Sequence, residues 1–138
     1  MTVTIQLDQN DVPSFLACLG LGTLMAIQKG QIPAEAATWT MGAPRVWEPL
    51  IEHSLVPKEI IDVFEQGDEL AALEALSPEL YEEELSLLID QLQETIGKVS
   101  APSWRLRWNL HENESILPSP SVKPNGYEEN RHIQQIAA

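Results

Sequence analysis

The beginning of the chain changes from an alternating pattern of apolar residues to a helical one. In "TVTIQLD", Val3, Ile5 and Leu7 alternate with polar residues, which is typical of a strand with one buried face. After Asp11, a candidate N-cap, apolar residues recur at helical spacing as far as Lys29. We therefore predict an N-terminal strand followed by a core helix, whose inward residues are Phe15, Leu16, Leu19, Thr23, Ala26 and Ile27.

Prolines and glycines punctuate the segment 33–76 at short intervals, and such residues mark the starts and stops of helices. The pattern predicts short helices that begin near Pro33, Glu48, Pro57 and Asp68. Trp39 and Trp47 are candidate packing anchors in this region, because large aromatic side chains bury much apolar area.

A longer helix is predicted from Ser77 to Gly97. Ser77 is a favourable N-cap, and Pro78 suits the first helical position. The apolar residues that follow keep a helical period that a strand would place on opposite faces. The predicted inward stripe is Tyr81, Leu85, Leu88, Ile89, Leu92 and Ile96.

"SWRLRWNL", residues 103–110, alternates again, so we predict a second strand with Trp104, Leu106, Trp108 and Leu110 on its inward face. The fold class expected is α+β and mainly α: several short helices and the long helix pack on a small sheet formed by the N-terminal strand and the 103–110 strand. Residues 1–111 would form a single globular domain. Residues 112–138, rich in proline and polar residues, would form an extended tail with a short helix between 127 and 136.

Composition and charge narrow the function. Hydrophobic residues make up 43% of the 138 residues, near the globular average, so most of the chain should fold. The net charge of -13 repels phosphate backbones and anionic lipids, which excludes nucleic acid and membrane surfaces as favoured partners. The apolar run 12–27 is shorter than the roughly 20 residues of a membrane span, and no signal sequence is evident, so we expect a cytoplasmic protein.

Catalytic and cofactor motifs are not evident. Gly20 and Gly22 resemble the start of a dinucleotide fingerprint, but Met25 stands where its third glycine belongs, so close helix packing is the better explanation. The histidines, at positions 53, 111 and 132, are too dispersed for a zinc site. Cys18, the single cysteine, is predicted to be a small buried hydrophobe. We therefore expect no cofactor, no metal and no enzymatic activity.

The distribution of acid is the unusual feature of this sequence. Between Glu59 and Glu94 there are twelve Asp and Glu residues and no Lys or Arg. A helix face usually mixes signs, because oppositely charged residues one turn apart stabilise it. Two interpretations stay open: a solvated acidic face, or a docking surface for a basic protein. The candidate partner-binding residues are Glu65, Asp68, Glu69, Glu82, Glu83, Asp90 and Glu94.

The segments "LGLGTLMAIQKGQIPAEAA" and "PKEIIDVFEQGDELAALEALSPE" resemble a small family of uncharacterised, stand-alone bacterial proteins. The shared pattern is an apolar helix with a lysine-glycine stop, a short Ala/Glu-rich helix, and an acidic G-x-E-L turn before a leucine helix. It covers residues 15–96 and implies no activity. In size and acidity the chain also resembles the immunity proteins that neutralise bacterial toxins, a class without a shared motif.

The most concrete function that these observations favour is a non-enzymatic acidic binding protein, an immunity-type inhibitor of a basic partner such as a bacterial toxin. The alternative is a structural or regulatory homo-oligomer, a homodimer for example, in which "WRLRW" or the terminal strands pair between subunits. Tryptophan and arginine are frequent at interfaces, although a strand with a packed aromatic face and a solvated basic face is the explanation of "WRLRW" that we favour.

Overall fold

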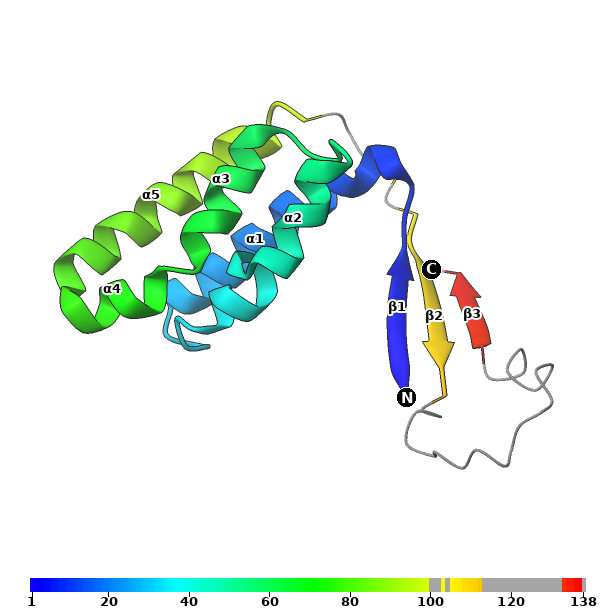
Figure 1. Cartoon of the computed structure of the whole chain (residues 1–138), viewed down its shortest axis with the longest axis horizontal. Helices are drawn as coiled ribbons and strands as arrows, with labels where there is room; N and C mark the ends of the chain where they lie inside the picture. Colours follow the sequence, from blue (N-terminus) through cyan, green and yellow to red (C-terminus); the bar gives the residue numbers. More distant parts are fainter. Residues whose placement is uncertain (100–102, 104, 113–132, 138) are drawn as a thin grey trace. The chain divides into compact units, whose positions relative to one another are not determined.

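The computed structural model describes residues 1–99, 103, 105–112 and 133–137. The protein is α+β and mainly helical, as predicted, and its chain divides into two compact units (Figure 1). One unit is helical and comprises residues 9–102. The other contains Met1–Asp8 together with the described residues from Ser103 onward, and it holds the strands. The expected division into a domain of residues 1–111 and a tail stays a prediction.

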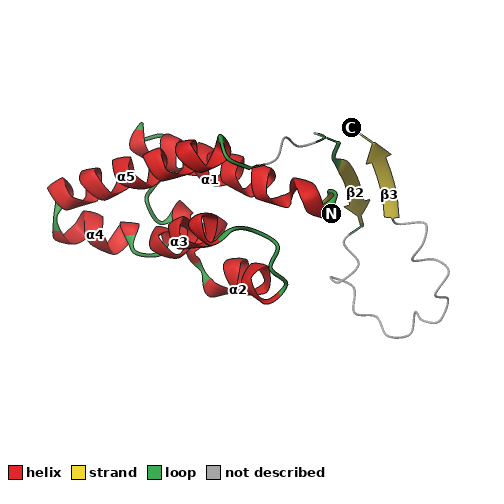
Figure 2. Cartoon of the chain, turned by 90° about the horizontal axis from the view of Figure 1, so that it is seen from above, coloured by secondary structure: helices red, strands yellow, loops and turns green. Residues whose placement is uncertain are grey.

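The helical unit begins with a 3-10 turn, η1 (Gln9–Asp11), and continues through five α-helices and one π-helical turn. Prolines occupy the first turns of α1, α2 and α5, where a missing backbone N–H costs nothing. This was predicted for α1 and α5, whereas α2 begins at Pro44 and not near Glu48, as had been predicted. Figure 2 shows the helices in red and the loops that connect them in green. The elements are α1 (Val12–Gln28), the π turn η2 (Thr38–Gly42), α2 (Pro44–Glu52), α3 (Lys58–Gly67), α4 (Leu70–Leu76) and α5 (Pro78–Ile96).

Helix α5 is the centre of this unit and packs on α1, α3 and α4. Its start is fixed by Ser77, whose Oγ accepts a hydrogen bond of 3.3 Å from the backbone N–H of Leu80. The predicted inward stripe is confirmed. Leu85, Leu88, Ile89 and Leu92 are buried, and Tyr81 and Ile96 at its two ends are half-buried.

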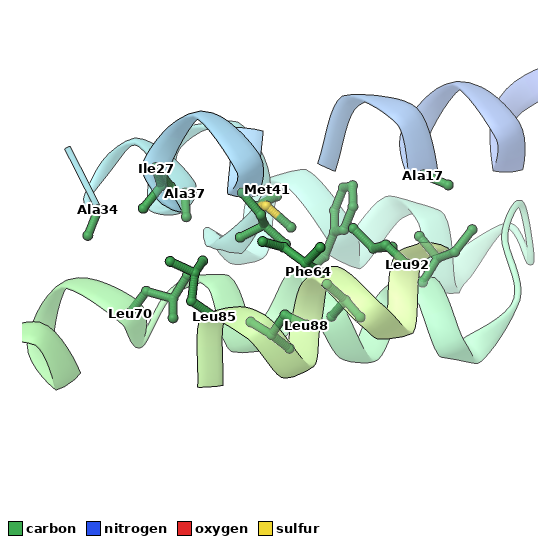
Figure 3. Packing of buried hydrophobic residues seen from close by; sticks show 14 residues of the cluster. Ala17, Ile27, Ala34, Ala37, Met41, Phe64, Leu70, Leu85, Leu88 and Leu92 are labelled. Atoms are coloured by element: carbon green, nitrogen blue, oxygen red, sulfur yellow. The ribbon is translucent and has the colours of Figure 1, made fainter. Parts of the chain in front are cut away.

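The core lies between α1, α3, α5 and the π turn. Its largest fully buried side chains include Phe64, Met41, four leucines and Ile60, and Figure 3 shows Met41, Phe64 and Leu92 converging there. Of the two predicted anchors, Trp47 is half-buried against this cluster and donates to the carbonyl of Gly42. Trp39 is 64% exposed, so the prediction for it was wrong. Its ring lies beneath the guanidinium of Arg45 instead, 5.6 Å from the ring centroid.

The buried face of α1 is rotated from the predicted one. Small residues occupy much of it beside Leu24 and Ile27. Thr23 and Ile27 are buried as predicted, whereas Leu19, also predicted inward, is exposed. The reason is close packing: a Cβ at Gly20 would lie 3.0 Å from Leu92 Cδ1 and 3.0 Å from Phe64 Cε1. Glycine allows that approach without displacing either side chain. The buried residues of α1 are Ser14, Ala17, Gly20, Thr23, Leu24 and Ile27.

The rotation of α1 also exposes Cys18, so the prediction that this thiol is buried was wrong. By length and composition alone, the segment Gln9–Gln28 could cross a membrane, and it is the one such helix among the described residues. Its buried face contacts α3 and α5 within the helical unit. A core helix of a soluble protein meets the same criteria, so the structure is compatible with a soluble protein.

The second unit contains a three-stranded antiparallel sheet of order β1-β2-β3. Strand β1 (Thr2–Gln6) pairs with β2 (Arg107–His111) in a register that sets Val3 opposite Leu110 and Ile5 opposite Trp108. Apolar residues therefore share one face, as their alternation predicted. That Val3 and Ile5 would be buried was wrong, since they are 48% and 37% exposed. That helices pack on this sheet stays a prediction.

Two strand predictions need correction. Strand β2 begins at Arg107 and not at residue 103, so Leu106 precedes it, and Trp104 lies outside the described residues. A third strand, β3 (Ile133–Ala137), replaces the end of the helix expected at 127–136, whose other residues, 127–132, are not described. Backbone pairing with β2 explains β3, because such pairing needs no particular side chains.

Candidate partner-binding surface

Helix α5 carries four of the seven predicted binding residues, and all four are exposed. Asp90 and Glu94 follow Glu83 by seven and eleven residues. Helical geometry therefore puts all three on one side of α5, opposite the buried stripe. Glu82 lies elsewhere. It borders a hollow formed with Tyr81, Leu85 and residues at the end of α1.

The other three, Glu65, Asp68 and Glu69, lie at the junction of α3 and α4 and are also exposed. This junction is held by contact with the π turn. A Cβ at Gly42 would lie 2.3 Å from the backbone nitrogen of Asp68, so the two segments touch backbone to backbone. Gly67 makes a similar approach to Met41, where a Cβ would lie 3.0 Å from Cγ. Packing of the junction against the π turn therefore fixes the direction in which these three acidic side chains extend into solvent.

The acidic segment, residues 59–94, is mostly exposed to solvent, and most of its acids have no oppositely charged partner among the described residues. Of the acids between Glu59 and Glu94, Glu84 is half-buried and the others are exposed. The ion pairs found in the described part of the chain are at the segment's two ends: Lys58 Nζ lies 3.0 Å from Asp62, and Lys98 Nζ lies 3.0 Å from Glu94. Both pairs are on the surface, where an ion pair contributes little to stability. Asp62, Glu94 and Lys98 line the same groove between α3 and α5, so both pairs border it, and the other acids of the segment have no ion pair within the described residues.

Lys58 feels this surrounding charge. Its hydrogen bond to Asp62, followed by the charge of that carboxylate, raises the pKa of the ammonium above its usual range. The more distant charges of Glu65 and Glu59 act in the same direction. A cation that approaches this region is therefore stabilised in its charged form.

The structure brings further acidic residues beside the predicted ones. Glu59 and Asp62 of α3 line one groove of about 380 Å³ together with the predicted Glu94 of α5, and its other walls include Thr95 and Lys98. A second hollow, of about 310 Å³, brings Glu69 together with Glu84 and the apolar side of α4. The i, i+3 spacing of Glu59 and Asp62 indicated a shared face, but only the packing of α3 on α5 shows that Glu94 joins it.

Tyr81 is a second described titratable group with a shifted pKa. Partial burial raises the pKa of its phenol, and the charges of Glu74 and Glu82 raise it further. The phenol therefore keeps its proton beyond the pH at which a free tyrosine would lose it. Because it titrates in strongly alkaline solution, this group gives no acid or base near neutral pH.

The remaining candidates for chemistry stay apart. His53 is exposed in the helical unit, and His111 lies on β2, where its Nε2 is 3.2 Å from Thr4 Oγ1 on β1. His132 lies outside the described residues. Within the described ranges, no group of three or more His, Cys, Asp or Glu side chains has the arrangement to hold a metal ion.

Fold and surface together define a small, mainly helical α+β protein with an acidic helical surface. The family described as "Protein of unknown function (DUF3969)" matches residues 7–110, and the chain belongs to this family. The match confirms the predicted resemblance to a small uncharacterised family and extends it into β2. No curated protein and no solved structure matched the chain.

Proposed function

We propose that this protein is a non-enzymatic binding protein of the bacterial cytosol that neutralises a basic partner, most concretely as an immunity-type inhibitor of a toxin. One observation supports the proposal above all. Acids of a single sign cover α3, α4 and α5, they are exposed, and the ion pairs described for them lie only at Lys58 and Lys98. Such a surface forgoes the stabilisation that mixed charges would give, and attraction to a cationic protein offsets that loss.

The surface would act mainly on the rate of association. A one-sign potential extends about one Debye length, roughly 10 Å at moderate salt, and draws an oppositely charged protein into productive orientations. Affinity would depend on a few desolvated side chains at the centre of the contact. The exposed acids at its rim would set the salt dependence of binding.

The experiment uses the tagged full chain to capture proteins from host lysate at low and at moderate salt, followed by identification of the retained proteins by mass spectrometry. The test variant reverses Glu82, Glu83 and Asp90 to lysine. With the captured partner, we expect its association rate to fall by about tenfold or more at low salt, because steering accelerates association by that order. Circular dichroism should show an unchanged helical fold, since all three residues are exposed.

A matched control separates local charge from total charge. Glu35, Glu48 and Glu52 are exposed and lie before the acidic segment. Reversal of these three to lysine changes the net charge of the protein equally, so it should leave the association rate much closer to the wild-type value. Equal slowing by both variants, or retention of no stoichiometric basic partner at either salt concentration, would contradict the proposal.

A second candidate, self-association through the sheet, is favoured by the strand order. β2, which contains the end of "WRLRW", is the middle strand and already has two neighbours, so it offers no edge. The described sheet ends at β1 and β3, and edge strands are where a second chain can pair. Light scattering over a range of protein concentrations tests this candidate, because a monomer at every concentration would refute it.

A further inference from the structure

Two leucines of α5 point away from the core. Leu80 is 53% exposed and Leu87 is 50% exposed, whereas the other leucines of the helix, at positions 85, 88 and 92, are buried. Leu80 and Leu87 are separated by two helical turns, so they lie on the same side, about 10.5 Å apart along the axis. We call this pair the leucine seam. An outward face that was only solvated would need no such aligned pair.

Carboxylates surround the leucine seam. Glu83 and Glu84 each lie three or four residues from both leucines, which makes them neighbours of both on the helix surface. Asp90 stands one turn beyond Leu87. Leu76, at the end of α4, adds exposed apolar surface immediately before α5. The result is an apolar strip with an acidic border on both sides.

We infer that the basic partner docks an amphipathic helix on the leucine seam. This helix of the partner has apolar residues two turns apart and Lys or Arg beside them. The inference rests on the proposed function. The seam's repeat matches two turns of a helix, whereas a strand rises about 3.3 Å per residue and places same-face residues about 7 or 13 Å apart. Apolar knobs of the partner would cover the leucines while its cations meet Glu83, Glu84 and Asp90.

Charge complementarity selects this occupant over a second copy of the chain. Two α5 helices face to face would bring Glu83 and Asp90 of one copy against the same acids of the other. Like charges opposed across an interface oppose binding. The structure also contains a small-scale version of the proposed contact: Lys98 Nζ lies 3.0 Å from Glu94 Oε1, one turn away on the same surface. A lysine of the partner would meet the other acids in the same way.

The probe is a labelled synthetic peptide of leucine and lysine, patterned so that the leucines form one helix face, and its control is a scrambled peptide of identical composition. Binding of both to the full-length protein is followed by fluorescence anisotropy. The test variant is Leu80→Ser with Leu87→Ser. The control variant, Leu19→Ser with Ile51→Ser, removes exposed apolar side chains of α1 and α2, which are 39% and 50% exposed.

Wild-type protein should bind the patterned peptide at least about tenfold more tightly than the scrambled one, because two leucine contacts are gained. The Leu80/Leu87 variant should lose that preference and the control variant should keep it. Equal binding of both peptides, unchanged binding by the Leu80/Leu87 variant, or no binding of the patterned peptide would overturn the inference. Those results leave the proposed function standing, since lysate capture and charge reversal test it independently. Circular dichroism of each variant verifies the fold.

Discussion

Two glycines of α1, only two residues apart, should respond to alanine in opposite ways. Alanine in a helix interior is favoured over glycine by about 1 kcal/mol, and this gain applies to both positions. At Gly22 a Cβ would have no neighbour within 4 Å among the described residues, so Gly22→Ala should stabilise the protein by about that amount. At Gly20 the same Cβ would press on Leu92 and Phe64 at 3.0 Å.

The cost at Gly20 follows from the density of the core. Phe64 and Leu92 are fully buried, so neither can move aside without displacing other side chains. Adding a methyl group to such a core costs about 1–3 kcal/mol. After subtraction of the helix gain, Gly20→Ala should be neutral or destabilising by up to about 2 kcal/mol. The two variants should therefore differ by about 1–3 kcal/mol in their free energy of unfolding.

Urea denaturation followed by circular dichroism measures this difference. With an m-value of about 1–3 kcal/mol per molar urea, the midpoints of Gly20→Ala and Gly22→Ala should be separated by about 1 M. Equal increases in both midpoints would show that α1 does not approach α5 and Phe64 closely, and would refute the explanation given for the rotated face of α1.

Two further predictions concern α5. Ser77→Ala removes the acceptor for the N–H of Leu80 and should lower the free energy of unfolding by about 0.5–2 kcal/mol. Ser86→Ala, within the same helix, should not lower it. Equal urea midpoints for the two variants would refute the role of Ser77 as the N-cap. The raised pKa of Tyr81 favours the folded state only while its phenol is protonated. Because the unfolded chain loses this proton first, the free energy of unfolding should fall as the pH rises above about 10 and through the folded pKa of Tyr81. The fall should be smaller in Glu82→Gln. Urea midpoints across alkaline pH check both expectations, and an identical fall in Glu82→Gln would refute the role of Glu82.

Helix α5 could be predicted closely because every local signal agreed. Its N-cap, its first proline and its apolar stripe lie in one continuous stretch of sequence, and tertiary packing agrees with them. The buried face of α1 could not be predicted in that way, because Gly20 and Ala17 were selected by the closeness of approach and not by hydrophobicity. Trp39 was misjudged for a related reason: Met41, more adaptable in shape, filled the core beside it.

The candidate surface shows the same division. Exposure of Glu83, Asp90 and Glu94 followed from the predicted stripe of α5, since residues opposite an inward face are outward. The groove that joins Glu94 to Asp62 depends on the packing of α3 on α5, which no local pattern encodes. The leucine seam could have been predicted from the sequence, because Leu80 and Leu87 fall outside the inward stripe.

The pairing of β1 with β2 has a consequence for the order of folding. Thr4 and His111 meet across these strands although 107 positions separate them, so no hairpin turn can bring the strands together. The contacts within each helix are local and form fast, and the packing of α1 on α5 joins segments that are closer in sequence than β1 and β2. The pairing of β1 with β2 must close the longer loop. The helices should therefore be in place before the sheet assembles, and on the ribosome β1 must wait until all five α-helices and β2 have been synthesised.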